Sequence, residues 1–240
     1  MNYILLVVLL AILSASAASS QEKAPPPRTQ FIQKLKAELK EKKKVFIYFY
    51  SDSREQSKIY MEQINKIAVK EKSSVVFVDA SSRETGDVLT DYKIMYVPAI
   101  VQVEYRRGIT GFFHGKTQVD QFFKNKGKSL GLNDKKAKKI LDDIEASGAE
   151  GKTTIIEFYA PWCGVCERIA PVLKKAEKES KGQMLILRVN MDETQTPAQW
   201  YEVDSPPENV VLDSDGVLRG RFRVINDTDE LFRYLNQSGL

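Results

Sequence analysis

The stretch that decides the fold is residues 157–166, EFYAPWCGVC. Strand-type residues up to Tyr159 lead into a Pro-Trp turn and then into two cysteines, Cys163 and Cys166. We expect these cysteines to open a helix, where residues three apart share one face and their sulfurs can reach disulfide geometry. The unpaired N–H groups and positive end of that helix favour the thiolate of Cys163, whereas Cys166 lies buried one turn further in. The pattern predicts a redox-active disulfide in which Cys163 attacks and Cys166 resolves.

A Cys-x-x-Cys pair can also be half of a zinc site or a coincidence. The chain holds only two cysteines and one histidine, His114, which argues against a zinc site built by the protein. Glu167 follows Cys166 where haem attachment needs a histidine. We therefore expect no metal and no organic cofactor, and we interpret His114 as an ordinary residue at a strand end.

A pattern similar to the sequence around this stretch occurs a second time, earlier in the chain. Adding 109 to the apolar run 45–50, VFIYFY, gives 154–159, TIIEFY, and the same offset pairs Tyr92 with Tyr201 and Pro98 with Pro207. A constant offset over about fifty residues indicates a duplicated domain. Helices that alternate with strands, followed by a late strand pair, predict an α/β fold in each copy, with a central mixed sheet flanked by helices.

Hydrophobic periodicity places the elements at matching positions of the two repeats. We expect the last helix to be capped by Thr228. The expected helices are 29–42, 54–70, 119–125, 133–146, 163–180 and 229–236, and the expected strands are 45–50, 75–78, 100–105, 110–114, 154–159, 184–189, 210–212 and 217–223.

The N-terminal residues have the pattern of a targeting segment. Residues 4–13 are an unbroken apolar run, and Ala15-Ser16-Ala17 fits a small-x-small cleavage site. We expect a signal peptide at 1–17 and an extended, proline-rich linker at 18–28; a short buried helix or a membrane anchor are the alternatives. No other segment is apolar enough to cross a bilayer, so we expect no membrane span in the mature chain.

The composition excludes several other classes of protein. Hydrophobic residues make up 42% and charged residues 28%, which excludes wholesale disorder. A formal charge of +4 is too balanced to argue for a nucleic-acid partner. Two cysteines exclude a disulfide-dense secreted scaffold.

Residues 157–166 resemble the active-site segment of protein disulfide isomerases, within the thioredoxin superfamily. Pro171 matches the proline that kinks the family's active-site helix, and Pro207 matches its cis-proline. The resemblance covers roughly 133–240, and the first repeat resembles the fold without the motif. It implies two tandem thioredoxin-like domains: a redox-inactive one at 29–127 and a catalytic one at 128–240.

The resemblance also implies roles for single residues. Glu157 becomes a buried carboxylate that accepts the proton of Cys166, whereas the residues alone leave a solvent-facing strand position open. The implied catalytic residues are Cys163, Cys166 and Glu157; the active-site flank is Trp162, Gly164, Val165 and Pro207; and Pro206 and Pro207 bind substrate.

Two departures from the family pattern bear on function. Val165 stands where many disulfide isomerases have histidine, and Pro206 lacks the N–H that the family's residue before the cis-proline offers to substrate. In the first repeat, Arg54, Ser57 and Tyr48 stand opposite Cys163, Cys166 and Glu157, so we expect no redox chemistry there.

The resemblance thus implies a thiol–disulfide oxidoreductase of the disulfide isomerase type. Its expected partners are unfolded or disulfide-containing proteins and a thiol–disulfide exchange partner, in the lumen of the endoplasmic reticulum. Because residues 237–240 form no Lys-Asp-Glu-Leu type signal, secretion is the alternative location. The alternative functions are a chaperone or peptide-binding module with vestigial redox activity, and a dedicated thiol–disulfide electron carrier.

Overall fold

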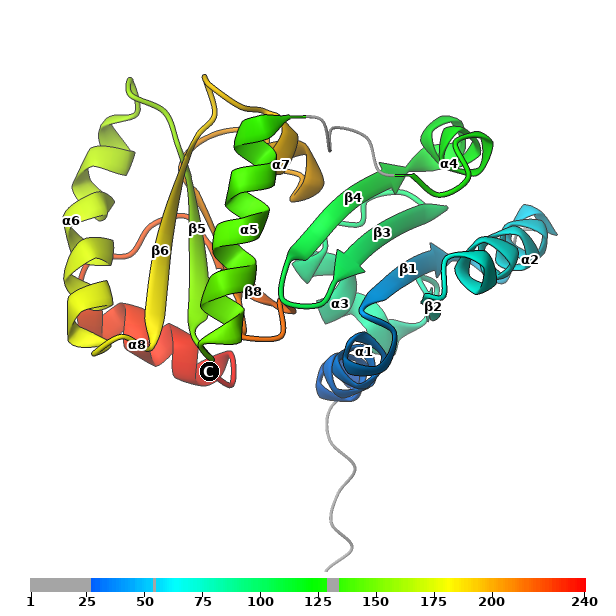
Figure 1. Cartoon of the computed structure of the whole chain (residues 1–240), viewed down its shortest axis with the longest axis horizontal. Helices are drawn as coiled ribbons and strands as arrows, with labels where there is room; N and C mark the ends of the chain where they lie inside the picture. The colour runs from blue at the N-terminus through cyan, green and yellow to red at the C-terminus, as the bar shows by residue number, and fades with distance from the viewer. Residues whose placement is uncertain (1–26, 54, 129–133) are drawn as a thin grey trace, which may run out of the picture.

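Two four-stranded sheets with the same topology form the framework of the protein (Figure 1). The computed structural model describes residues 27–53, 55–128 and 134–240. The expected signal peptide, most of the expected linker and Arg54 lie outside these residues. The first helix already begins at Pro27, two residues before the expected start.

The first domain places four strands between helices. Its strand order is β2-β1-β3-β4, with β1 parallel to β2 and antiparallel to β3. Its elements are α1 (Pro27–Lys42), β1 (Lys44–Tyr50), α2 (Glu55–Lys70), β2 (Ser74–Asp79), a 3-10 turn η1 (Arg83–Thr85), α3 (Gly86–Asp91), β3 (Ala99–Glu104), β4 (Gly108–His114) and α4 (Gly115–Lys124).

The second domain repeats the order as β6-β5-β7-β8, with the same strand directions. Both sheets are mixed and flanked by helices, so the predicted class of two tandem thioredoxin-like domains is confirmed. The elements are α5 (Lys135–Ala149), β5 (Thr153–Tyr159), α6 (Gly164–Glu179), β6 (Met184–Asn190), α7 (Thr196–Trp200), β7 (Glu208–Leu212), β8 (Leu218–Phe222) and α8 (Thr228–Gln237).

Local chemistry explains where these elements begin and end. The central strands β1 and β5 each bury five consecutive residues, as expected of strands covered on both faces. The cap of α8 is Asp227, whose side chain accepts the N–H of Glu230, so the expectation of Thr228 is wrong by one residue. A carboxylate at this position also complements the positive end of the helix, which a hydroxyl does not.

The two domains meet through their β-hairpin turns. The N–H of Arg106, after β3, donates to the carbonyl of Asp215, after β7, at 2.7 Å. Gly108 and Gly216 both have positive φ, and a Cβ on Gly216 would lie 2.8 Å from the Gly108 nitrogen. Only glycine allows the two turns to approach this closely.

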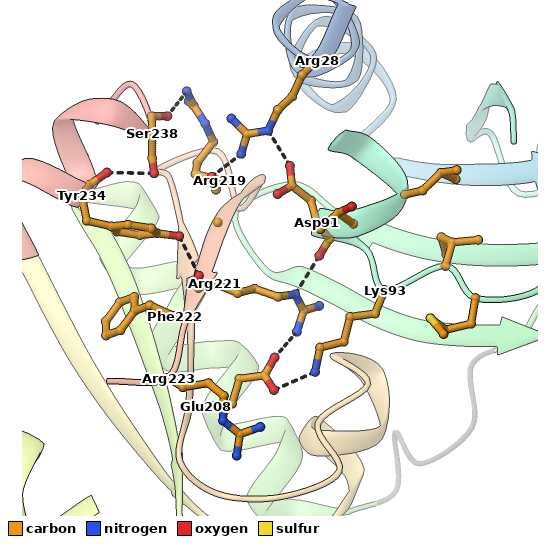
Figure 2. A pocket seen from close by; sticks show the side chains of 15 residues that line it. Arg28, Asp91, Lys93, Glu208, Arg219, Arg221, Phe222, Arg223, Tyr234 and Ser238 are labelled. Carbon is orange, nitrogen blue, oxygen red and sulfur yellow. Dashed lines mark hydrogen bonds and ion pairs between the residues drawn. The ribbon is translucent and has the colours of Figure 1, made fainter. Parts of the chain in front are cut away.

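Ion pairs across the interface surround this contact. Lys36 on α1 lies 3.1 Å from Asp213 and 3.0 Å from Asp215. Further along, Lys93 lies 2.6 Å from Glu208, a carboxylate that is 3% exposed (Figure 2). Each pair joins a cation of the first domain to a carboxylate of the second.

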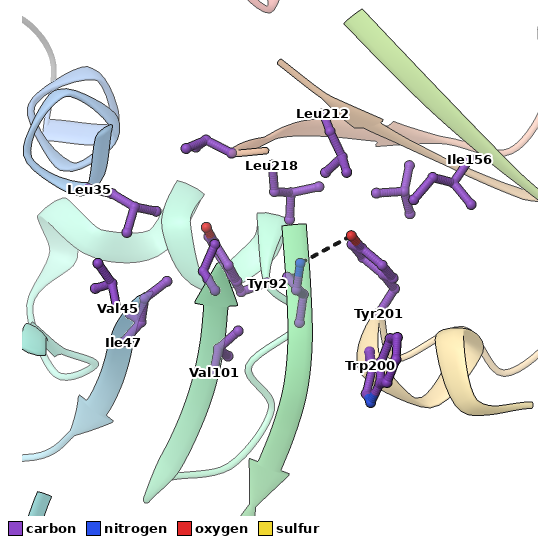
Figure 3. Close-up of a cluster of buried hydrophobic side chains, with 14 of the residues drawn as sticks. Leu35, Val45, Ile47, Tyr92, Val101, Ile156, Trp200, Tyr201, Leu212 and Leu218 are labelled. Atoms are coloured by element: carbon purple, nitrogen blue, oxygen red, sulfur yellow. Dashed lines mark hydrogen bonds between the residues drawn. The ribbon is translucent and has the colours of Figure 1, made fainter. Parts of the chain in front are cut away.

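Inside this polar rim the domains share one apolar cluster. It includes Leu35 and Val101 from the first domain and Ile156 and Leu212 from the second, all fully buried (Figure 3). The outer faces have separate clusters, under α2 and α4 in one domain and under α6 and α8 in the other. The inner faces of both sheets therefore form a continuous core, and the two domains pack as one body.

A hydrogen bond lies within the shared core. The hydroxyl of Tyr201, a residue 1% exposed, accepts the N–H of Ile109 on β4 at 3.1 Å (Figure 3). Its counterpart Tyr92 is equally buried, but its hydroxyl has no hydrogen-bond partner among the described residues. Burial raises the pKa of both phenols, so both stay protonated at neutral pH. Within the described ranges, no helix has the length and apolar character needed to cross a bilayer.

The two tyrosines form a matched pair for mutation. Tyr201→Phe leaves the buried N–H of Ile109 without an acceptor, so we expect a loss of about 1–3 kcal/mol in the free energy of unfolding. Tyr92→Phe removes a hydroxyl that has no such partner, so its cost should be near zero. Urea unfolding followed by circular dichroism measures both; equal losses would contradict the role of the Tyr201 hydrogen bond.

The ion pairs of Asp215 should make the stability of the protein depend on pH. Burial alone would raise the pKa of Asp215, but hydrogen bonding and charge from Lys36, and then from Lys40, lower that pKa below the ordinary value. A lowered pKa in the folded state stabilises the protein above the unfolded value of about 3.9, and this contribution is lost as pH falls through the folded pKa. We expect Asp215→Asn to destabilise the protein at pH 7 and to have little effect near pH 2.

The control for this prediction is Asp143→Asn. Asp143 pairs with Lys139 on the exposed face of α5, where an ion pair contributes little. The free energy of unfolding of each variant is compared with that of the parent at both pH values. A difference for Asp215→Asn that does not change with pH would refute the ion-pair explanation.

Candidate active site

The dithiol lies where the central strand of the second domain passes into a helix. β5 ends at Tyr159, a short turn follows, and α6 begins at Gly164 with Cys163 as its N-cap residue. The Cys163 sulfur accepts the N–H of Cys166 at 3.2 Å. A backbone donor and the positive end of α6 are thus directed at this sulfur, the environment that stabilises a thiolate.

The two cysteines are joined as a disulfide. The S–S bond connects Cys163 to Cys166, whose Cα atoms are 5.3 Å apart. Cys163 is 6% exposed and Cys166 is 1% exposed. Cys163 is therefore the more accessible of the two cysteines, and its role as the attacking thiol stays a prediction.

Apolar side chains surround the disulfide. Ala160 packs with both cysteines, and Tyr159 and Val165 lie against them partly buried. Val165 has no charge or hydrogen-bonding group to offer the Cys163 sulfur. An added Cβ on Gly164 would meet nothing within 4 Å, so a larger side chain fits at this position.

Trp162 forms an exposed apolar surface beside the disulfide. It is 70% exposed, and its indole Nε1 donates to Asp192 with a closest distance of 3.1 Å. The hydrogen bond holds the ring in place on the surface. Sequence reasoning missed Asp192, which follows β6 in a polar loop and has no motif to mark it.

Glu157 lies in the middle of β5 and is fully buried, so the alternative of a solvent-facing position is wrong. It pairs with Arg188, its neighbour in the parallel register of β5 and β6. The Nε of Arg188 donates to the carboxylate at 2.5 Å and Nη2 at 3.3 Å. Arg188 also lies over the ring of Tyr159, 4.1 Å from the ring centre. The site thus contains a buried carboxylate with a fixed cation beside it.

Arg188 is a second residue that sequence reasoning missed. A lone charge inside the apolar run 184–190 was a signal, but its pairing with Glu157 depends on the register between two strands. The hydrogen bond that Arg188 donates to the Glu157 carboxylate raises the pKa of Arg188, although partial burial acts against this. Both residues line a surface groove of about 600 Å³ beside α6, and Pro171, inside that helix, lines it too.

Two cis peptide bonds stand at matching positions in the repeats. They are Val97-Pro98 and Pro206-Pro207, and Pro207 is buried before β7. Pro206 has no N–H to donate to a bound chain. Exposed Ser205, next to it, accepts a hydrogen bond from Arg223 at 3.2 Å.

The corresponding place in the first domain holds different chemistry. Tyr48 stands where β5 has Glu157, and its hydroxyl donates to the carbonyl of Ser57 at 3.5 Å. Burial raises the pKa of Tyr48 to about 12. The Ser57 hydroxyl donates to the carbonyl of Ser51. The hydrogen bonds of Tyr48 and Ser57 stabilise the turn between β1 and α2. This turn has no thiol, because residues 1–127 contain no cysteine.

The described ranges also contain no cluster of three or more histidine, cysteine, aspartate or glutamate side chains placed to hold a metal ion.

Comparison with known proteins places the second domain in a family. A family profile described as Thioredoxin matches residues 135–237. The chain is 40% identical over 83 residues to Thioredoxin of Chlamydia caviae, covering 35% of this chain and 79% of the relative. It is 37% identical over 74 residues to Thioredoxin of Staphylococcus aureus, covering 31% and 71% respectively. The X-ray structure of Fasciola hepatica thioredoxin matches at 25% identity and a TM-score of 0.37, over 42% of this chain and 93% of that one.

The order of the cysteines on α6 predicts their division of labour. Cys166→Ser keeps the accessible sulfur but removes the one that resolves, so covalent mixed disulfides should accumulate on a non-reducing gel. Cys163→Ser leaves only the buried sulfur and should accumulate few. The double variant is the background control, and the opposite pattern would reverse the assignment.

Proposed function

Because this chain belongs to the thioredoxin family, we propose that it acts as a disulfide isomerase-type thiol–disulfide oxidoreductase on client proteins of the secretory pathway. The observation that supports this most strongly is the Cys163 sulfur, which lies at the N-terminus of α6 and accepts a backbone N–H. The family makes the pair Cys163–Cys166 a redox centre with thiol–disulfide exchange partners.

The exchange proceeds in two steps. In the reducing direction, the Cys163 thiolate attacks a client disulfide, forms a mixed disulfide and releases one client thiolate. The Cys166 thiolate then attacks the Cys163 sulfur, releases the second client thiolate and forms the Cys163–Cys166 disulfide. Two electrons pass to the client, whose two sulfurs each take up a proton. The reverse sequence, starting from the disulfide form, oxidises a client dithiol.

Glu157 serves as the proton acceptor for Cys166 in this proposal. Its complete burial and its position on β5, the strand that leads directly into the dithiol turn, support the role. Arg188 holds the carboxylate in place with two hydrogen bonds. The groove that both residues line offers a route by which the proton reaches water.

The secretory role rests on the N-terminal sequence and on the domain arrangement. The apolar run at 4–13 supports a signal peptide at 1–17, and we place the mature protein in the lumen of the endoplasmic reticulum. A cysteine-free domain at 29–127 joined to a redox domain at 128–240 supports a disulfide isomerase rather than a single-domain thioredoxin.

A dedicated electron carrier is the second candidate, and Pro206 favours it. A client chain that lies along the cis-proline segment cannot accept a hydrogen bond from Pro206, so the site has a weaker hold on extended peptides. A carrier that meets one folded partner does not depend on that hydrogen bond.

Two assays separate these functions, and the Cys163→Ser, Cys166→Ser double variant is the control in both. A disulfide isomerase reduces insulin and also recovers the activity of scrambled ribonuclease. Reduction of insulin without recovery of ribonuclease would indicate the carrier. Refolding help that survives in the double variant would indicate a chaperone and overturn the enzymatic proposal.

The side chain at position 165 should influence the reduction potential of the Cys163–Cys166 pair. A histidine near the Cys163 sulfur stabilises the thiolate, and therefore the reduced form, which makes the disulfide more oxidising. Val165→His should raise the reduction potential by about 30 mV, which corresponds to ~1.4 kcal/mol for a two-electron couple. Equilibration against glutathione measures the change.

Lys175→His on the exposed part of the same helix is the control for this experiment. It adds the same side chain to α6 about three turns beyond the N-terminus of the helix. An unchanged reduction potential in Val165→His would mean that a group other than residue 165 determines the reduction potential of the site.

A further inference from the structure

A groove of about 670 Å³ runs between the two domains, and neither cysteine is among the residues that line it (Figure 2). One wall is α3 of the first domain and the loop after it, including Lys93 and Met95. The other wall is β8 with the C-terminal part of α8. The mechanism of thiol exchange uses none of these side chains.

Positive charge is in excess in this groove. Its lining holds five cations, Arg28, Lys93, Arg219, Arg221 and Arg223, and two carboxylates, Asp91 and Glu208. Both carboxylates are already paired, Asp91 with Arg28 at 2.6 Å, and Glu208 with Lys93 at 2.6 Å and Arg221 at 2.8 Å. Behind the lining, Asp213 pairs with Arg219 at 3.1 Å.

Arg223 is the cation that has no carboxylate partner among the described residues. It is exposed, and the hydrogen bonds it donates go to the carbonyl and hydroxyl oxygens of Ser205, at 3.5 and 3.2 Å. Ser205 precedes Pro206-Pro207, the segment to which substrate binding is assigned above. The unpaired charge therefore stands at the end of the groove that lies beside the cis-proline segment.

The remaining lining is apolar and accessible. Leu89, Ile94 and Met95 contribute from the first domain and Phe222 from the second. Met95 is 78% exposed, so its side chain is accessible to an occupant of the groove. An occupant of the groove would thus meet apolar side chains from both domains together with arginines.

The edge of β8 restricts the kind of occupant. The carbonyl of Arg219 accepts from Arg28 at 2.5 Å, and the carbonyl of Arg221 accepts from Tyr234 at 2.9 Å (Figure 2). These backbone acceptors are not open to an added strand. Recognition in the groove must therefore come from side-chain charge and apolar contact rather than from extension of the sheet.

We propose that the groove binds an extended polypeptide segment in which acidic and large apolar side chains alternate. A carboxylate of the segment pairs with Arg223, and its apolar side chains pack on Met95 and Phe222. The inference rests on the proposed function, because the segment belongs to a client whose disulfide reacts at Cys163. The first domain then supplies one wall of the client site.

A cysteine-free probe tests the groove separately from the dithiol. The probe is a fluorescein-labelled dodecapeptide of alternating Glu and Leu or Phe, and the same peptide with Lys in place of Glu is the matched control. Fluorescence anisotropy with the full chain should show binding of the acidic peptide only. Raising the salt from 0.1 M to 1 M should weaken it, because the screening length falls from about 10 Å to about 3 Å.

Glutamate substitutions in the groove test where the peptide binds. Arg223→Glu and Met95→Glu each alter an exposed side chain of the groove, and each should weaken the acidic peptide about tenfold through lost contact and added repulsion. Lys70→Glu makes the same change in charge as Arg223→Glu, on the exposed face of α2, and should leave the affinity unchanged. Circular dichroism checks that all three variants are folded.

Several results would overturn the proposal. They are equal binding of both peptides, equal weakening by Lys70→Glu, and no weakening by Arg223→Glu or Met95→Glu. A concentration-dependent dimer that Arg223→Glu dissociates would mean that a second copy of the chain occupies the groove. Binding that persists in the Cys163→Ser, Cys166→Ser variant supports the groove even if the redox assays reject the proposed function.

Discussion

The hydrogen bond from the Ile109 N–H to the Tyr201 hydroxyl lies inside an apolar core that belongs to both domains. A buried N–H that has a partner across a domain boundary keeps the two halves in one arrangement, because separating them exposes apolar surface and breaks the bond in the same event. The ion pairs of Lys36 and Lys93 and the close contact of Gly108 with Gly216 act in the same direction. The groove beside β8 has a defined shape because of this fixed arrangement.

The redox site depends on a smaller set of constraints. β5 carries Glu157 into the interior and delivers the next turn to the start of α6, so the acid and the thiols are placed by one continuous segment. The backbone of α6 directs an N–H at the Cys163 sulfur, and Arg188 holds the carboxylate through two hydrogen bonds. The chemistry is thus built from the end of one strand, the start of one helix and one neighbouring strand.

The sequence alone predicted the strands and the longer helices because apolar residues repeat with a clear period, as in 45–50 and 154–159. It did not predict α3 and α7, whose six and five residues are too few to show a helical period. The Cys163–Cys166 pair was visible as a motif, whereas Arg188 and Asp192 were not, because their roles depend on strand register and on a loop contact. The groove could not be predicted, since its walls lie more than a hundred residues apart in the chain.

The shared core also has a consequence for how this protein can change in evolution. Two repeats joined by a flexible tether could be lost, exchanged or shuffled separately. Here Leu35 and Val101 of one repeat and Ile156 and Leu212 of the other are buried against a common interior, and a glycine in each hairpin leaves no room for a side chain. A descendant that discarded the cysteine-free half would first need polar replacements over that whole surface. Selection for a stable redox domain therefore also preserves the first domain, although that domain contains no cysteine.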